Sequence, residues 1–102
     1  MSNTMVRYTV KPDRAADNEA LVRQVYDELR EKAPEGLHYA TFVLEDGVSF
    51  VHLARFDGDR EGNPLTEIAA FRAFQAGIGE RTDVAPAASP LREVGSYRFW
   101  GE

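Results

Sequence analysis

The sequence LHYATFVLEDGVSFVHLARF, at residues 37–56, contains two runs of β-branched and aromatic residues that flank Asp46-Gly47. An Asp-Gly pair between two such runs favours a two-residue type I′ turn, because both positions tolerate a positive φ. This turn sets the register of the two strands and brings Thr41 opposite His52. The stretch is therefore predicted to form one long β-hairpin.

Neither face of this hairpin has the polar character of a surface exposed to water. Helices from the same short chain can cover one face of a sheet, but few residues remain to cover the other. We therefore expect a second copy of the chain on the second face, in a homodimer. One face is predicted to carry Tyr39, Thr41, Val43, Phe50 and His52, and the other Ala40, Phe42, Val51 and Leu53.

The composition indicates one globular domain that spans residues 1–102. Of its residues, 43% are hydrophobic and 28% are charged, as in ordinary globular proteins. No apolar run approaches the roughly 20 residues that a membrane span needs. The first ten residues, MSNTMVRYTV, lack the basic, apolar and small-residue regions of a secretory signal. A cytoplasmic protein without a membrane segment is expected.

Charge and local sequence argue against nucleic acid as a partner. The net charge of −5 repels a phosphate backbone. RNA-recognition domains use the same strand order as the one derived below, and their third strand carries an aromatic octamer. The corresponding residues here keep Gly47 and Phe50 but have Asp46 at the basic position and Val48 and Leu53 at two aromatic positions.

A strand and a helix are predicted before the hairpin. Residues 6–11 alternate apolar and polar side chains until Pro12 ends the pattern. Residues 15–32 then place apolar side chains at spacings of three and four, opposite a charged face, which is typical of an amphipathic helix. Pro34 and Gly36 are expected to end this helix.

A second helix and a closing strand are predicted after the hairpin. Asn63 and Pro64 supply an N-cap and a proline suited to the first helical position. Residues 81–90 contain two prolines and are interpreted as an extended connector, with the last strand at 91–100. The buried stripe of the second helix is expected to comprise Leu65, Ile68, Phe71, Phe74 and Ile78.

The predicted order is strand, helix, strand, strand, helix, strand. With right-handed crossovers, this order gives a ferredoxin-like βαββαβ sandwich of the α+β class. Its four-stranded antiparallel sheet has the order 4-1-3-2, and both helices lie on one face. The first and third strands are then central neighbours, so Tyr8 and His52 are expected to lie close together.

His52 is the residue best placed for chemistry, and two interpretations of it stay open. A neutral imidazole in the middle of a strand can act as a general base or donate a hydrogen bond to a ligand. The commoner role of a lone histidine on a mixed apolar face is structural, with its ring bonded to Thr41 or Tyr8. The presence or absence of a cavity beside His52 would distinguish the two interpretations.

Metal binding is not expected. His38 and His52 point to opposite faces of one hairpin and cannot converge on an ion. Asp57, Asp59 and Glu61 lack the spacing of a calcium loop and are interpreted as part of a polar connector. The chain has no cysteine, which excludes disulfides and thiolate ligands.

Three blocks of the sequence carry a resemblance to a known family. They are RYTVKPDRAADNEALV (7–22), LEDGVSFVHLARF (44–56) and NPLTEIAAFRAFQAGI (63–78), followed by a closing strand. Their layout, with Val10-Lys11-Pro12 before a charged helix, resembles small domains of the antibiotic-biosynthesis monooxygenase type. These domains belong to the dimeric α/β-barrel superfamily.

The resemblance implies a homodimer whose two sheets pack face to face, with an apolar cavity between sheet and helices in each subunit. Some members oxygenate polycyclic aromatic substrates without metal or flavin, and relatives degrade haem. Active members commonly carry a tryptophan and a histidine in or near the second helix. This chain has Phe71 and Phe74 there, and its only tryptophan is Trp100. The expected haem ligand is therefore missing.

Two functional hypotheses follow. The first is a cofactor-free monooxygenase that acts on a hydrophobic aromatic metabolite, with His52 as base and Tyr8 and Tyr39 as orienting hydroxyls. The second is a non-catalytic dimeric module that binds a small hydrophobic molecule or has a structural role. The pocket is expected to be lined by Phe50, Phe71, Phe74 and Arg72.

Overall fold

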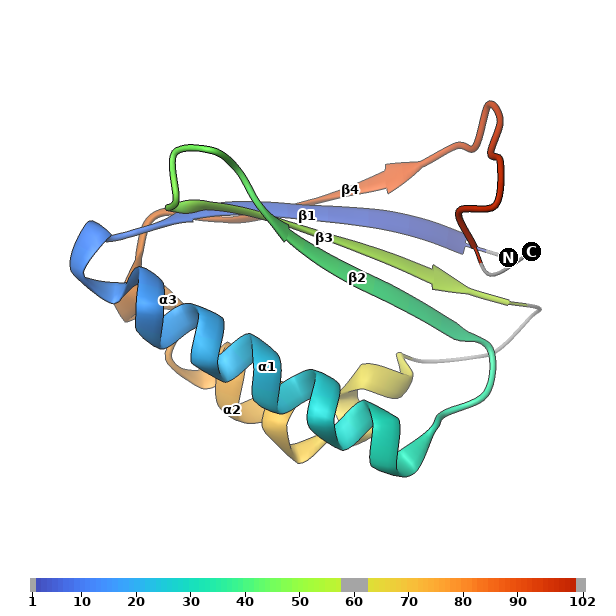
Figure 1. Ribbon diagram of the computed structural model, residues 1–102, viewed down its shortest axis with the longest axis horizontal. Coiled ribbons are helices and arrows are strands. Elements are labelled where there is room, and N and C mark those ends of the chain that lie inside the picture. The colour runs from blue at the N-terminus through green and yellow to red at the C-terminus, as the bar shows by residue number, and fades with distance from the viewer. Residues whose placement is uncertain (1, 58–62, 101–102) are drawn as a thin grey trace.

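The computed structural model describes residues 2–57 and 63–100 and shows helices packed on one face of a four-stranded antiparallel sheet (Figure 1). The sheet order β2-β3-β1-β4 is the predicted order 4-1-3-2 in reverse, so the ferredoxin-like α+β prediction is confirmed. Asp59 and Glu61, interpreted above as part of a polar connector, lie outside the described residues. The strands are β1 (Ser2–Val10), β2 (Leu37–Val43), β3 (Ser49–Phe56) and β4 (Thr82–Leu91).

The hairpin β2–β3 has the predicted register but a different turn. Asp46 is not among the residues with positive φ, whereas Gly47 has a φ of 76°. The Gly47 N–H donates to the Leu44 carbonyl at 2.9 Å, and the Asp46 carboxylate accepts the N–H groups of Val48 and Ser49. The predicted type I′ turn is therefore wrong, because the Asp46 side chain closes a wider loop. The Leu44 N–H still bonds to the Ser49 carbonyl, which preserves the pairing.

The first helix begins and ends where the sequence indicated. α1 spans Ala15–Lys32 after a short 3₁₀ turn, Pro12–Arg14. It ends at Ala33, which has a left-handed φ of 43° and whose N–H donates to the Leu29 carbonyl at 2.7 Å. Its Val22 and Val25 are buried against the sheet, as the apolar spacing requires.

The second helix is broken, which corrects the prediction of one continuous helix. A 3₁₀ turn, Pro64–Glu67, precedes α2 (Ala69–Ala76) and the short α3 (Ile78–Arg81). Asn63 caps the 3₁₀ turn as predicted, because its side chain accepts the Leu65 N–H at 2.9 Å. Ile68, with a ψ of 113°, then interrupts the helical path. Leu65, Ile68, Phe71 and Phe74 of the predicted stripe are buried, and Ile78 is partly buried.

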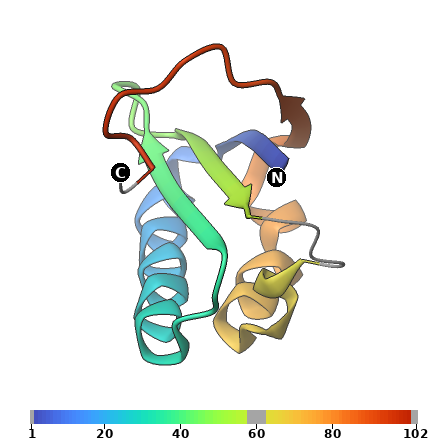
Figure 2. The same ribbon diagram turned by 90° about the vertical axis from the view of Figure 1, so that its right-hand side faces the viewer.

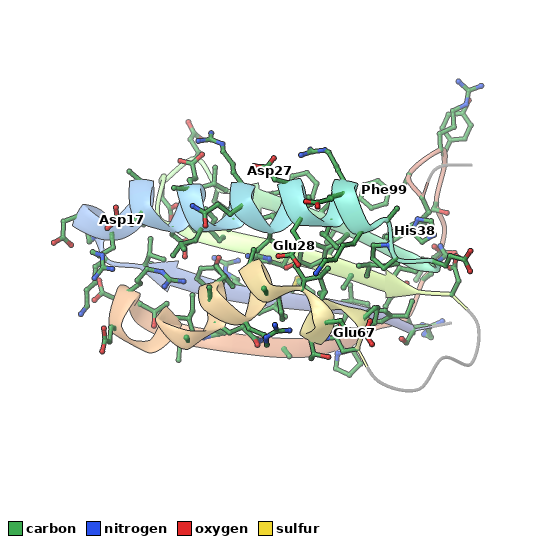
Figure 3. All side chains as sticks on the ribbon, turned by 90° about the horizontal axis from the view of Figure 1, so that it is seen from below. Asp17, Asp27, Glu28, His38, Glu67 and Phe99 are labelled. Carbon is green, nitrogen blue, oxygen red and sulfur yellow. The ribbon has the colours of Figure 1, made fainter. Side chains whose placement is uncertain are left out.

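A carboxylate of α1 starts α2. Glu28 accepts the N–H groups of Ala69 at 3.0 Å and Ala70 at 2.8 Å, two of the groups that a helix start leaves unpaired. Lys32 lies 2.7 Å from the same carboxylate. Figure 3 shows Glu28 at the seam between the two helices. The hydrogen bond from Lys32, followed by those from the α2 backbone, lowers the pKa of Glu28 to about 2.

The last strand lies nearer the N-terminus than predicted. β4 occupies residues 82–91, most of which fall in the predicted connector 81–90, and residues 92–100 of the predicted strand 91–100 do not pair in the sheet. Prolines are tolerated here because β4 is an edge strand. Pro86 also falls in a register shift between the pairs made by Arg7 and Thr9, where a ladder bond is not required.

Residues 92–100 pass over the side of the sheet opposite the helices (Figure 2). There the Arg55 guanidinium lies 5.2 Å from the centre of the Trp100 ring and 3.4 Å from the Glu93 carboxylate. The Trp100 indole N–H donates to the same carboxylate at 2.9 Å. Trp100 therefore packs against Arg55 of β3 and does not join the ladder.

The two faces of the sheet have different surroundings (Figures 1 and 2). Among the described residues, only the segment 92–100 crosses the second face, here called the open face, and Phe42 on it is 49% exposed. No helix in the described ranges is long and apolar enough to cross a membrane. The core between helices and sheet comprises Tyr8, Val10, Val22, Val25, Phe50, Leu65, Ile68, Phe71 and Phe74.

Candidate active site

A cavity of about 270 Å³ lies between the sheet and the helices that follow the hairpin. All four strands contribute to its floor, and the segment 63–78 forms its roof. Most of its wall is apolar, as is usual for pockets that hold small organic ligands. It is lined by Thr4, Val6, Tyr8, Tyr39, His52, Ala54, Phe56, Asn63, Leu65, Phe71, Phe74, Gln75, Ile78, Pro86 and Ala88.

Three aromatic side chains with polar atoms meet on the cavity floor. The Tyr8 hydroxyl is 2.8 Å from Nε2 of His52, and the Tyr39 hydroxyl is 2.6 Å from Nδ1. Thr41 Oγ1 is also 3.1 Å from Nδ1. Both ring nitrogens therefore have protein partners, and the expected bonds to Tyr8 and Thr41 are both present. The strand order brings these residues together, because β1 and β2 flank β3.

The hydrogen bonds continue into the helical layer on both sides of His52. Asn18 of α1 donates to the Tyr8 hydroxyl at 2.9 Å, and the Arg81 guanidinium donates to Asn18 at 3.2 Å. On the other side, the Tyr26 hydroxyl is 2.8 Å from Thr41 Oγ1. The site is thus one connected polar network within an apolar core, a combination that holds its side chains in fixed orientations.

Burial keeps the three central groups uncharged at neutral pH. It lowers the pKa of His52 to about 4, because the imidazolium form is poorly solvated there. It also raises the pKa of Tyr8 to about 12, and it raises the pKa of Tyr39 well above the usual range of a phenol. At pH 7 the site therefore presents a neutral imidazole between two neutral hydroxyls.

Most of the expected site residues line the cavity, but two do not. His52, Tyr8, Tyr39, Phe71 and Phe74 all contribute to its wall. Phe50 instead lies outside it and stacks on Tyr8, with ring centres 5.5 Å apart. Arg72 is exposed and its guanidinium donates to the Thr66 carbonyl at 2.6 Å, so the expectation that it lines the pocket is not met. Its position on α2 turns it outward from the stripe that faces the sheet.

Two buried polar residues of the network had not been identified from the sequence. Asn18 is 0% exposed and lies four and seven positions before Val22 and Val25, on the buried stripe of α1. A polar residue within an apolar stripe is the signal that could have indicated it. Arg81 is 2% exposed and ends α3, which itself was not predicted. No sequence pattern marks it.

Comparison with known proteins identifies the fold. No protein-family model matches the sequence, and a search of curated proteins finds no match. Rv0793 from Mycobacterium tuberculosis is similar, with 18% identity, a TM-score of 0.71 and coverage of 93% of this chain and 96% of that chain. A provisionally named antibiotic biosynthesis monooxygenase from Nitrosomonas europaea has 15% identity and a TM-score of 0.75, covering 93% and 100%.

A third structure, from Caulobacter crescentus and provisionally given the same name, has 19% identity and a TM-score of 0.66, covering 92% and 90%. At these identities the likeness establishes the fold. The chain has the fold of antibiotic-biosynthesis-monooxygenase-like domains, as the resemblance in its sequence predicted.

Proposed function

We propose that this chain is a cofactor-free monooxygenase of the antibiotic-biosynthesis type, acting on a hydrophobic aromatic metabolite. The observation that carries the proposal is the apolar cavity with Tyr8, His52 and Tyr39 on its floor. A cavity of about 150 Å³ already holds benzene, so a volume of about 270 Å³ can hold more than a single ring. The fold shared with the provisionally named antibiotic biosynthesis monooxygenase from Nitrosomonas europaea supports the same class of activity.

The roles follow from the contacts. Oxygenation without a cofactor requires an electron-rich substrate that loses a proton and then transfers electrons to O₂. When a ring CH₂ becomes C=O, O₂ supplies the oxygen atom, the substrate supplies the electrons and one water is released. His52 serves as base through Tyr8, a residue that lines the cavity and whose hydroxyl is 2.8 Å from Nε2. The Tyr39 hydroxyl orients a substrate oxygen.

Oxygen uptake with a panel of polycyclic phenols and enolisable ketones, in buffer treated with chelator and free of flavin, tests this proposal. His52→Gln should lower turnover by about 100-fold or more, the range in which general-base catalysis contributes. Arg72→Ala is the matched control, because Arg72 is exposed and outside the cavity. Binding of panel members without any oxygen uptake would contradict the enzymatic proposal.

The alternative is a non-catalytic module that binds a small hydrophobic molecule. The state of His52 favours it, because both ring nitrogens are already bonded and burial lowers its pKa to about 4. An imidazole of such low basicity removes only acidic protons at pH 7. In this case the wild type and His52→Gln would both bind members of the panel, and neither protein would take up oxygen.

We further propose that the chain acts as a homodimer through the open face. The face carries exposed apolar side chains, among them Phe42 on the edge strand β2, and no helix covers it in the described ranges. Two polar atoms on it are buried without a hydrogen-bond partner among the described residues: Oδ1 of Asn3, and Nε of Arg55, which has only a 3.5 Å ion-pair contact with Asp57. Unpaired buried atoms of this kind support a partner surface that supplies the missing groups.

A further inference from the structure

We propose that Asn18 and Arg81 are positioning residues that set the direction of the hydrogen bonds through the site, so that the Tyr39 hydroxyl donates to a carbonyl or phenolate oxygen in the cavity. The inference deepens the proposed function, on which its ligand class rests. It assigns a role to two residues that touch no ligand themselves.

Arg81 fixes the direction of these hydrogen bonds. A guanidinium in a protein only donates hydrogen bonds. Its Nε donates to Oδ1 of Asn18 at 3.2 Å, and a terminal nitrogen donates to the Phe74 carbonyl at 2.8 Å. Arg81 is 2% exposed and makes no ion pair with the described residues. Its charge is held by neutral acceptors and by the Phe74 ring, whose centre is 5.2 Å from the guanidinium carbon.

Because Arg81 can only donate, Asn18 must in turn donate to Tyr8. Since its amide oxygen faces Arg81, its NH₂ group must face the Tyr8 hydroxyl, to which it donates at 2.9 Å. Asn18 is 0% exposed, so an inverted amide would leave its donors against a guanidinium with no water to relieve them. The Tyr8 oxygen therefore accepts one bond from Asn18.

The Tyr8 proton then has one good acceptor. Nε2 of His52 is 2.8 Å away, and Tyr8 is 1% exposed. If Nε2 carried a proton instead, the Tyr8 oxygen would accept twice and its own proton would be left buried. An unpaired proton costs less at the other end of these hydrogen bonds, because Tyr39 is only partly buried and is one of the residues that line the cavity.

His52 consequently carries its proton on Nδ1 and donates to Tyr39. The distance from Nδ1 to the Tyr39 oxygen is 2.6 Å, shorter than the 3.1 Å to Thr41 Oγ1. With its oxygen accepting from His52, Tyr39 is free to donate its own proton. Two acceptors are open to that proton: Thr41 Oγ1, which also contacts Nδ1 of His52, or an acceptor atom of a ligand in the cavity. A ligand with a carbonyl or phenolate oxygen supplies the second.

Asn18→Asp reverses the direction of these hydrogen bonds without changing the shape of the side chain. A carboxylate accepts from Arg81 and also accepts the Tyr8 proton, so the Tyr8 oxygen must accept from Nε2–H. Nδ1 then becomes an acceptor for the Tyr39 proton, which is withdrawn from the cavity. The first measurement is the protonation of each His52 ring nitrogen by ¹⁵N NMR in the protein without ligand. We expect Nδ1–H in the wild type and Nε2–H in Asn18→Asp.

The second measurement compares two probes of one shape, acetophenone and α-methylstyrene, in which C=CH₂ replaces C=O. Asn18→Asp should weaken the binding of acetophenone relative to that of α-methylstyrene by about fivefold in Kd, the effect of one net hydrogen bond. Tyr39→Phe should cause the same loss while leaving the wild-type tautomer in place. It serves as the second variant if Asn18→Asp does not fold.

Nε2–H in the wild type, or an unchanged tautomer in Asn18→Asp, would overturn the inference. So would an unchanged affinity ratio in both variants, or a wild type that binds no acetophenone. None of these measurements involves O₂. A protein that consumes no oxygen but shows both expected results therefore retains the directed network while the monooxygenase proposal fails.

Discussion

Both faces of the hairpin are largely apolar in sequence, yet the two faces of the sheet differ in how their polar groups are paired. On the helix side, Tyr8 and His52 are almost completely buried, and each polar atom of the network has a partner. On the open face, Oδ1 of Asn3 is buried without a hydrogen-bond partner among the described residues, and Nε of Arg55 has only the Asp57 carboxylate, 3.5 Å away. One face is therefore complete within a single chain, whereas the other has the features of a surface that a partner completes.

The largest effect is expected from the helix side of the core. Phe71→Ala or Phe74→Ala should lower the free energy of unfolding by about 3–5 kcal/mol, because each removes a buried ring next to the cavity. Urea denaturation measures this change. Phe99→Ala is the control, since Phe99 is 52% exposed and should cost about 0.5 kcal/mol or less. Losses below about 1 kcal/mol at both core positions would show that α2 is misplaced.

The next largest effect is the pH dependence of stability that His52 causes on the helix side of the sheet. Its folded pKa of about 4 lies below the ordinary value of 6.5, so the unfolded chain binds the proton more readily. Stability is therefore complete above pH 6.5 and falls as the pH drops toward 4, by about 3 kcal/mol. Urea denaturation at several pH values measures the slope. His52→Gln should remove the part of the pH dependence that His52 contributes. An identical slope in that variant would exclude His52 as the source of the pH dependence.

A smaller free-energy change is expected on the open face, where it should affect association and not folding. Phe42→Glu places a charge on the proposed dimer surface and should weaken association by about 2 kcal/mol or more, about 30-fold in Kd. Sedimentation equilibrium measures the Kd, and circular dichroism checks that the fold is retained. Gln24→Glu adds the same charge to the exposed side of α1 and should leave association unchanged. A wild type that is monomeric at micromolar concentration would refute the dimer.

The smallest effect is expected where the helices meet. Glu28→Gln should slightly lower the melting temperature at pH 7, because it weakens the bonds to Lys32 and to the α2 backbone. The folded pKa of about 2 is below the ordinary 4.5, so the wild-type contribution is present above pH 4.5 and is lost as the pH falls toward 2. Thermal unfolding followed between pH 7 and 2 measures it. Equal melting curves for the two proteins would mean that Glu28 does not stabilise α2.

The sequence alone determined the elements whose signals are local. Alternation and the Asp46-Gly47 pair predicted the hairpin register, and apolar spacing predicted α1 with both ends correct. These patterns are reliable because each reflects a repeat of the backbone itself, two residues in a strand and 3.6 in a helix. The strand order followed from the element order, and it correctly predicted that Tyr8 and His52 meet.

The tertiary structure decided what depends on contacts between distant residues. β4 forms at 82–91 despite its prolines, because an edge strand with a register shift needs fewer ladder bonds than a central strand. The second helix starts again at Ala69, whose N–H donates to the carboxylate of Glu28, 41 residues earlier in the chain. The direction of the hydrogen bonds through His52 depends on Arg81, which no local pattern connects to Asn18. Such features arise from packing and from the pairing of buried polar groups, which only the assembled chain brings together.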